Sequence, residues 1–196
     1  MKLKIMFFIS LVCFVIFEAM GQNKINFSIV HSGKNIGELT AEKTQEGKHS
    51  IYKSKTTVSY HLLVTIKVVH NNEVVFDNGL FQNSIVHSQI GKHKKNEYLT
   101  RLADGKLLYS INGSNERELK NIKTTVTQLF FEEPIAVQQL YSAEKGEFHS
   151  LELIEKGVYS KKDTKGNKNT YYYNNGKLKK IEIETNSISF SMLRIE

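Results

Sequence analysis

The chain has 196 residues, a formal net charge of +7, a single proline and a single cysteine. Its basic residues are nearly all lysines, and the only arginines are Arg101, Arg117 and Arg194. Because proteins that read nucleic acids depend on arginine for bidentate contacts, this composition predicts no nucleic-acid partner. The densest lysine groups, at 92–95 and 161–168, lie beside Gly or Asn, so we expect solvated loops there. Weak attraction to an anionic surface is the alternative.

Residues 1–21 have the pattern of a secretory signal peptide. Lys2 and Lys4 precede an uncharged apolar run at 5–17, and Gly21 ends a small-x-small cleavage site. The run is shorter than the about 20 residues that a membrane-spanning helix needs, and an uncleaved anchor is the alternative. We expect cleavage after Gly21 and an exported product, periplasmic or secreted. The product is expected to be soluble, with one β domain over residues 22–196.

The cysteine content limits the chemistry of the exported product. Cys13 lies inside the apolar run after the bulky Val12, which is not the setting of a lipidated cysteine. Residues 22–196 therefore contain no disulfide, no cysteine nucleophile and no thiolate metal site. The seven histidines have no H-x-x-x-H or H-E-x-x-H spacing. The sequence thus predicts neither a metal nor a cofactor, and stability must come from a hydrophobic core.

Alternation of apolar and polar residues predicts β-strands along most of residues 22–196. It begins at 25–29 and resumes at 39–42, with turns at 32–35 and 45–47. The run from His49 to His70 reads as one long strand, followed by a two-residue hairpin loop at Asn71-Asn72. One face of this strand carries Tyr60, Leu62, Val64, Ile66 and Val68. Further strands are predicted at 74–81, 84–90, 97–102, 106–111, 148–154, 158–161, 168–173, 177–184 and 188–195.

One stretch departs from this pattern. Ile122, Val126, Leu129 and Phe130 have the spacing of one helical face, and Pro134 follows, so the sequence predicts a short helix near 122–131. A second helical turn is predicted through 137–141, closed by glycine at 146. The predicted fold is all-β, a single curved antiparallel sheet or half-barrel meander of about 9–12 strands with that one short helix.

Tyr171, Tyr172 and Tyr173 stand just before Asn175-Gly176, a hairpin signal. Neighbouring strand residues face opposite sides, so the three rings cannot form one flat platform. A two-residue loop puts Tyr172 on the face of the isoleucines at 181 and 183. A three-residue loop, with Tyr173 opposite Lys177, puts Tyr171 and Tyr173 there instead. The second buries more apolar surface, and we predict it.

The C-terminal part carries three distinctive segments: FFEEP (130–134), LYSAEKGEFHSLEL (140–153) and GVYSKKDTKGNKNTYYYNNGKLKKIEIE (157–184). In this order they resemble an uncharacterised family of exported bacterial β proteins, domain of unknown function 6134. The resemblance implies an all-β domain over essentially all of the mature chain, similar to the curved half-barrel sheets of periplasmic lipoprotein carriers. That second likeness concerns the fold alone. The family carries no catalytic assignment, so no functional residues are transferred.

Catalytic arrangements are weak in this sequence. Glu132 and Glu133 are adjacent, so their side chains diverge and make no natural acid–base pair. His149 with Ser142 or Ser150 lacks a G-x-S-x-G nucleophile elbow. His61 and His70 could meet across strands, but surface or half-buried histidines are the simpler interpretation. The sequence predicts a protein that is not an enzyme.

Two non-catalytic functions remain. In the first, an apolar concave sheet face binds a lipid or other amphiphile. In the second, the protein is a structural or protein-interaction domain of the cell envelope, with a fully packed core, no ligand and envelope proteins as partners. The two differ in whether the space under Leu129 and Phe130 is open or packed. The candidate ligand-binding residues are Leu62, Val64 and Ile66 on the strand and Val126, Leu129 and Phe130 on the helix.

Overall fold

β-strands form most of the chain that the computed structural model describes, residues 21–61, 65–93, 95–185 and 188–195. The predicted signal peptide, apart from Gly21, and the candidate residues Leu62 and Val64 lie outside these ranges. The strands are β1 Gly21–His31, β2 Lys34–Glu46, β3 His49–His61, β4 Thr65–Asp77, β5 Leu80–Ile90, β6 Asn96–Ala103, β7 Lys106–Ile111, β8 Ser114–Leu119, β9 Gln139–Ser142, β10 Glu147–Glu155, β11 Val158–Lys162, β12 Lys168–Asn174, β13 Lys177–Glu184 and β14 Ser189–Ile195.

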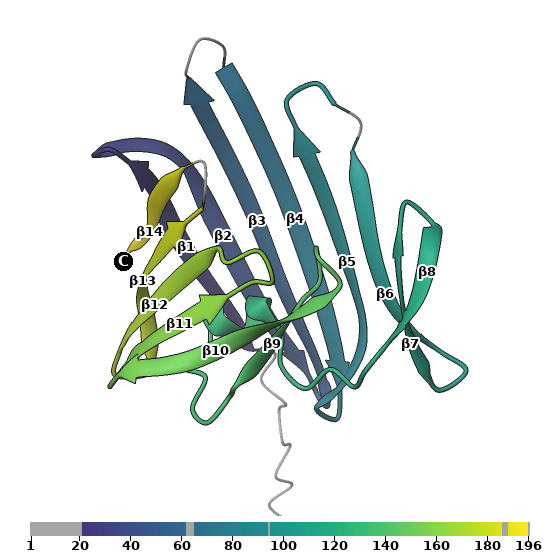
Figure 1. The fold of residues 1–196 in the computed structure, drawn as a ribbon. Helices are drawn as coiled ribbons and strands as arrows, with labels where there is room; N and C mark the ends of the chain where they lie inside the picture. The colour runs from purple at the N-terminus through teal and green to yellow at the C-terminus, as the bar shows by residue number, and fades with distance from the viewer. Residues whose placement is uncertain (1–20, 62–64, 94, 186–187, 196) are drawn as a thin grey trace, which may run out of the picture.

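All the strands belong to one antiparallel sheet in the order β8-β7-β6-β5-β4-β3-β2-β1-β14-β13-β12-β11-β10-β9. The first eight strands form one meander and the last six form another, and the pairing of β1 with β14 joins them. The sheet curls, so the shorter strands β9–β14 face the lower part of the long strands β2–β5, which extend beyond them (Figure 1). The predicted single curved antiparallel sheet is confirmed, and its 14 described strands exceed the predicted 9–12.

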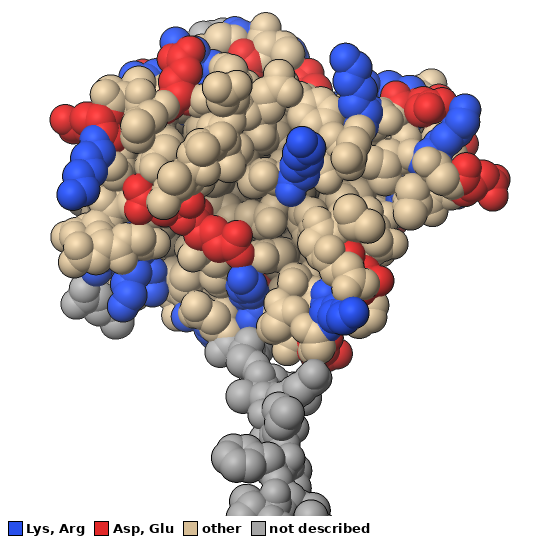
Figure 2. All heavy atoms as spheres, turned by 90° about the horizontal axis from the view of Figure 1, so that it is seen from below, with Lys and Arg blue, Asp and Glu red and all other residues tan. Residues whose placement is uncertain are grey.

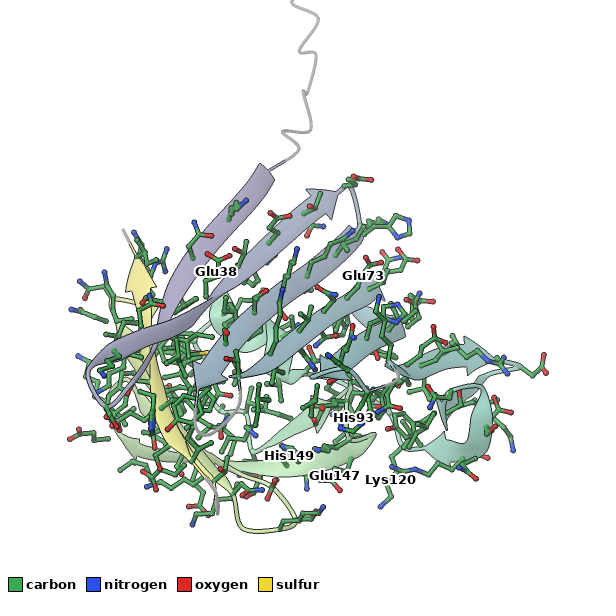
Figure 3. The ribbon with its side chains drawn as sticks, turned by 90° about the horizontal axis from the view of Figure 1, so that it is seen from above. Glu38, Glu73, His93, Lys120, Glu147 and His149 are labelled. Atoms are coloured by element: carbon green, nitrogen blue, oxygen red, sulfur yellow. The ribbon has the colours of Figure 1, made fainter. Side chains whose placement is uncertain are left out.

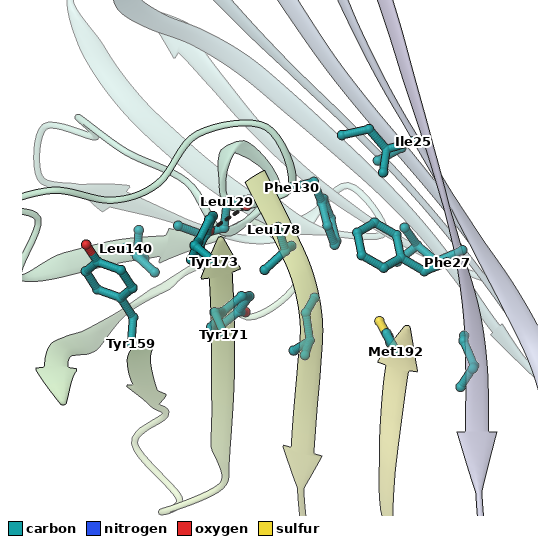
Figure 4. Close-up of a cluster of buried hydrophobic side chains, with 14 of the residues drawn as sticks. Ile25, Phe27, Leu129, Phe130, Leu140, Tyr159, Tyr171, Tyr173, Leu178 and Met192 are labelled. Carbon is teal, nitrogen blue, oxygen red and sulfur yellow. Dashed lines mark hydrogen bonds between the residues drawn. The ribbon is translucent and has the colours of Figure 1, made fainter. Parts of the chain in front are cut away.

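Two hydrophobic clusters fill the inside of the curl. Alternation explains the first: Ile25, Phe27 and Ile29 of β1 are buried, whereas the residues between them are not. They pack with the buried face of β12–β14 and with Leu129 and Phe130 (Figure 4). The second cluster joins β3–β7 to β9 and consists of Tyr52, Val74, Phe76, Phe81, Val86, Leu107, Ile122, Tyr141 and Ala143.

Side chains bring the two edges of the open sheet together. Arg117 of β8 donates a hydrogen bond to the carbonyl oxygen of Gly146, at 2.7 Å, in the turn between β9 and β10. Its guanidinium lies 4.9 Å from the ring centre of Tyr109. The Tyr109 hydroxyl donates to the Glu144 carbonyl oxygen at 2.9 Å. These contacts hold the turn at 143–146 against the first meander. Among the described residues, no backbone ladder joins the two edge strands, β8 and β9.

The prediction of one continuous strand from His49 to His70 is wrong. β3 ends at His61 and β4 begins at Thr65, and Asn71-Asn72 lies inside β4, paired with residues of both β3 and β5. The chain therefore reverses between His61 and Thr65, and it reverses again at Asn78-Gly79, with φ of 51° and 74°; the prediction missed both reversals. Two positive φ values are typical of a tight hairpin turn, so the predicted strand at 74–81 is divided there.

The predicted helix near 122–131 is shorter than expected, a 3-10 helix η1, Val126–Phe130. It begins late because Thr125 and Gln128 form a capping box there and the main chain before it is extended. The Thr124 carbonyl accepts a hydrogen bond from the Tyr141 N–H at 2.8 Å. The second predicted helical turn is wrong, since β9 pairs with β10 over that segment.

The hairpin that contains Tyr171, Tyr172 and Tyr173 differs from the prediction in its loop length and agrees with it in which rings are buried. The loop is the two-residue Asn175-Gly176, with φ of 50° and 73°, so the predicted three-residue loop is wrong. A register shift after Tyr172 nevertheless pairs Tyr173 with Leu178, while Tyr171 pairs with Ile181. This bulge returns Tyr171 and Tyr173 to the buried face, as predicted, and leaves Tyr172 on the outer face.

Candidate binding site

The inner face of β4 changes in polarity along its length. At the end nearest residues 62–64 it presents Ile66 and Val68, which are half-buried. The next inner residues are His70 and Asn72, and beyond them the face enters the second hydrophobic cluster at Val74. His70 and Asn72 therefore form a polar section between two apolar sections of β4. They lie next to the apolar section that is less covered by the rest of the protein.

A group of apolar side chains surrounds this end of β4, and we call it the open-end strip. Its residues are Val58, Tyr60, Ile66, Val68 and Ile90. Tyr60 lies opposite Ile66, and Val68 lies opposite both Val58 and Ile90 in the strand register. Ile90 is 53% exposed and the other four are half-buried. The strip is on the part of β3–β5 that extends beyond β9–β14 (Figure 1).

A polar pocket of about 350 Å³ lies beside the strip, between the two meanders. The long strands contribute His70 and Asn72, and η1 contributes Val126. The Asn72 amide donates to the Thr127 hydroxyl at 2.6 Å, and its own oxygen has no described partner. The second meander provides the rest of the lining: Ser142, Ala143, Glu144, Lys145, His149, Lys161, Asp163, Asn167, Asn169 and Thr185.

Lys161 of β11 and His149 of β10 form a buried polar chain on the wall of this pocket. They are 7% and 4% exposed. The Lys161 amine lies 3.1 Å from His149 Nδ1, and His149 Nε2 lies 3.1 Å from a carboxylate oxygen of Glu147 (Figure 3 labels the last two). When the lysine donates to Nδ1, the ring proton is on Nε2 and is donated to Glu147. Thr164 also donates to this carboxylate, at 3.1 Å.

Burial controls the protonation of the basic groups around the pocket. It lowers the pKa of Lys161, against the attraction of carboxylates led by Asp163. It also lowers the pKa of His149, and the nearby charge of Lys161 acts in the same direction. The pKa of His70 is lowered by burial too, opposed by Glu144. Each group is thus biased towards its neutral form by the loss of water around it.

The candidate residues predicted from the sequence do not form a single wall. Ile66 is in the open-end strip, and Val126 lines the polar pocket. Leu129 and Phe130 are core residues, and the Phe130 ring centre lies 5.9 Å from that of Phe27. The space beneath these two η1 residues is occupied by the protein's own side chains (Figure 4).

Neither His149 nor Lys161 was predicted from the sequence to line a binding site. Lys161 was expected in a solvated loop, which is wrong, because it is a buried residue of β11, whereas Lys162 and Lys165 are exposed. The alternation along the two strands contained a signal for both residues. Lys161 is on the same strand face as Tyr159, and His149 is on the same strand face as Leu151. A lysine on the apolar face of a strand is unusual, because lysine is almost never buried unless it has a partner.

The catalytic arrangements weighed in the sequence have other roles here. Glu132 accepts hydrogen bonds from Lys43 and Tyr52, both at 2.7 Å, and Glu133 accepts one from Tyr159 at 3.0 Å. Both ring nitrogens of His149 are already hydrogen-bonded.

The register separates the two histidines that the sequence could have brought together, because it places His61 opposite Thr65 and His70 opposite Thr56. Over the described ranges, no three His, Cys, Asp or Glu side chains are placed to hold a metal ion. In the same part of the chain, no helix has the length and apolar character to cross a membrane.

The outer face of the long strands is charged and solvated. A shallow groove of about 570 Å³ there includes Glu38 and Glu73, labelled in Figure 3. Cross-strand ion pairs cover it, with Lys53 at 2.9 Å from Glu73. Seen from below, acidic and basic side chains are interspersed among other residues (Figure 2).

The curled, open sheet is a β-barrel-like fold, and the comparison with a solved structure agrees. The crystal structure of a β-barrel-like protein of domain of unknown function DUF1849 from Brucella abortus is similar, with a TM-score of 0.60 and 11% sequence identity. The similarity covers 90% of this chain and 96% of that one, and it concerns the fold.

The chain belongs to the family described as domain of unknown function (DUF6134), whose model matches residues 27–195. The resemblance found in the sequence is thereby confirmed. No curated protein matches the chain.

Proposed function

We propose that this protein is an exported, non-catalytic binding domain that holds a lipid or other amphiphile. The apolar part of the ligand lies along the open-end strip, and its polar head enters the adjoining pocket. One observation carries this proposal: the inner face of β4 passes from Ile66 and Val68 directly to His70 and Asn72. Successive inner residues are about 7 Å apart along a strand, so the apolar and polar parts are within reach of one short ligand.

The expected affinity is modest. Burying roughly 200 Å² of apolar ligand surface contributes about 5 kcal/mol before the costs of association. The strip is half-buried in the free protein, so part of its own surface is already removed from water. Binding of this strength suits a carrier or a sensor that must release its ligand.

A structural or protein-interaction domain of the cell envelope is the second candidate. The packing of Leu129 and Phe130 into the core favours it, because that part of the curl has no room for a ligand. Ile135, Leu153 and Ile154 are exposed apolar residues outside the strip, and they offer a surface for envelope proteins.

Amphiphile titration of residues 22–196 tests the first candidate. The chain has no tryptophan, so tyrosine fluorescence reports binding, and Tyr60 is within the strip. We expect Ile90→Glu to abolish binding of a fatty acid or lysophospholipid. The matched control is Ile154→Glu, because Ile154 is 59% exposed and Ile90 is 53% exposed. If no amphiphile binds the unmodified protein below millimolar concentration, the interaction domain becomes the better proposal.

A further inference from the structure

We propose that Lys161 binds the acid group of a carboxylate ligand, so that the amphiphile of this site is a long-chain carboxylic acid. The inference rests on the proposed function, since it assigns the polar head of the same ligand. It comes from a buried basic group that has no acidic partner of its own.

Lys161 lacks the counter-ion that a buried ammonium needs. Among the described residues its amine contacts the ring of His149, a neutral acceptor, and makes no ion pair within 4.0 Å. The exposed neighbour Lys162 has one, with Glu152 at 3.8 Å. A buried charge without a partner is strongly unfavourable, so the amine either stays neutral or is paired by something that enters the pocket.

Two of the three carboxylates that act on Lys161, Glu147 and Asp163, are already engaged. Glu147 accepts hydrogen bonds from His149 and Thr164. Asp163 accepts bonds from the Asn167 side chain, at 2.7 Å, and from main-chain N–H groups of its own turn. Two N–H donors of a charged Lys161 therefore remain for a ligand oxygen.

The surrounding charges favour a carboxylate over a phosphate. Glu144 and Asp163 line the same pocket, and Lys145, at the exposed rim, is the other ammonium there. A singly charged head matches Lys161, the one unpaired buried cation in the part of the chain that the structure describes, whereas a doubly charged phosphate adds repulsion from both carboxylates. Because burial lowers the pKa of Lys161, a bound carboxylate would raise that pKa again by pairing with the ammonium.

The path of the tail follows from the lining. His70 and Val126 lie at the pocket, and Val68 and Ile66 continue from His70 along β4 into the open-end strip. A carboxylate at Lys161 therefore has its alkyl chain directed towards apolar side chains. This arrangement distinguishes a fatty acid from a small acid such as acetate, which would use the head contact alone.

Three ligands with one tail isolate the head contact: dodecanoate, dodecyl phosphate and 1-dodecanol. Each is titrated by calorimetry against residues 22–196, Lys161→Met and Lys162→Met. Methionine keeps an unbranched apolar stem without the charge, and Lys162 is the adjacent exposed residue on the other face of β11. We expect Lys161→Met to weaken dodecanoate binding at least tenfold, to leave 1-dodecanol within threefold, and Lys162→Met to change neither.

The outcomes separate the two proposals. If dodecanoate binds the Lys161→Met variant as tightly as the unmodified protein, the role of Lys161 is overturned while amphiphile binding stands. If dodecyl phosphate binds more tightly than dodecanoate, the choice of a carboxylate is wrong. If no ligand binds the unmodified protein, the proposed function itself fails. A thermal melt checks folding, and Lys161→Gln, also neutral, repeats the test should the methionine variant melt early.

Discussion

The Tyr173 hydroxyl donates a hydrogen bond to the main-chain carbonyl of Leu129 at 2.6 Å, and so joins β12 to η1 inside the first hydrophobic cluster (Figure 4). Leu129 is itself 1% exposed. η1 is therefore fixed by a buried polar contact as well as by packing. This makes it part of the core and not a hinged cover over the sheet.

The tyrosine run should show an alternating pattern of stability. Tyr171→Ala and Tyr173→Ala should each lower the free energy of unfolding by about 3 kcal/mol, as the loss of a large buried aromatic does. Tyr172→Ala should cost less than about 1 kcal/mol, because its ring is on the outer face. Tyr173→Phe removes only the hydroxyl, with its bonds to the Leu129 and Glu132 carbonyls, and should cost about 1 kcal/mol. Urea unfolding measures all four, and a larger loss for Tyr172→Ala than for its neighbours would contradict the register.

Gly37 should not tolerate a side chain. A Cβ atom there would overlap the Thr57 carbonyl oxygen and lie 2.8 Å from Val58 Cα, both main-chain atoms of β3. We expect Gly37→Ala to destabilise by about 3 kcal/mol, because the β2–β3 ladder must move apart. Gly105→Ala is the control, since no atom lies within 4 Å of its added Cβ and only its positive φ opposes alanine. Equal melting temperatures for the two variants would disprove the close approach.

Acid should destabilise the protein below neutral pH. Burial lowers the pKa values of His70 and His149 from 6.5 in the folded state. As the pH falls through 6.5, the unfolded chain binds protons that the folded protein does not, so the free energy of unfolding decreases. Above pH 6.5 this contribution to stability is complete. Urea unfolding between pH 7 and pH 5 should show the decrease, and His149→Gln should make it smaller. A pH profile unchanged by that substitution would rule out His149 as a source.

Arg117 should hold the pocket wall at 143–146 in place. Arg117→Ala removes its bonds to the Gly146 and Lys145 carbonyls and its contact with Tyr109. Because Arg117 is exposed, we expect only about 1 kcal/mol of global destabilisation. The amide of Gly146, bonded to the Ser142 carbonyl at 2.8 Å, should exchange its hydrogen faster. Arg101→Ala is the control, since Arg101 pairs with Glu116 on the same meander. Equal exchange at Gly146 in both variants would contradict the role.

Processing is tested directly. N-terminal sequencing of the product from its native host should begin at Gln22, as the basic start, apolar run and small residues before it indicate. An intact Met1, or a lipid on Cys13, would contradict the predicted cleavage.

Alternation predicted most strands because a curled sheet with one buried face imposes a period of two on each of them. Asn78-Gly79 was missed because apolar residues stand close on both sides of it, Val74, Val75 and Phe76 before and Leu80 and Phe81 after. The face of Tyr173 was predicted correctly although its loop was not, since a bulge compensated for the loop length. The pocket could not be predicted, because His70 and Lys161 come from different meanders and meet only when the sheet curls.

The ladder between β1 and β14 also determines when the fold can be completed. β1 is synthesised first and β14 last, yet they are neighbours in the middle of the sheet, with Phe27 opposite Arg194. Until residues 189–195 have been made, one edge of β1 has no partner and the second meander has nothing to join. Contacts so distant in sequence form late and slowly. The two meanders therefore become one sheet only after β14 has been made, so the central ladder is the last part of the fold to form.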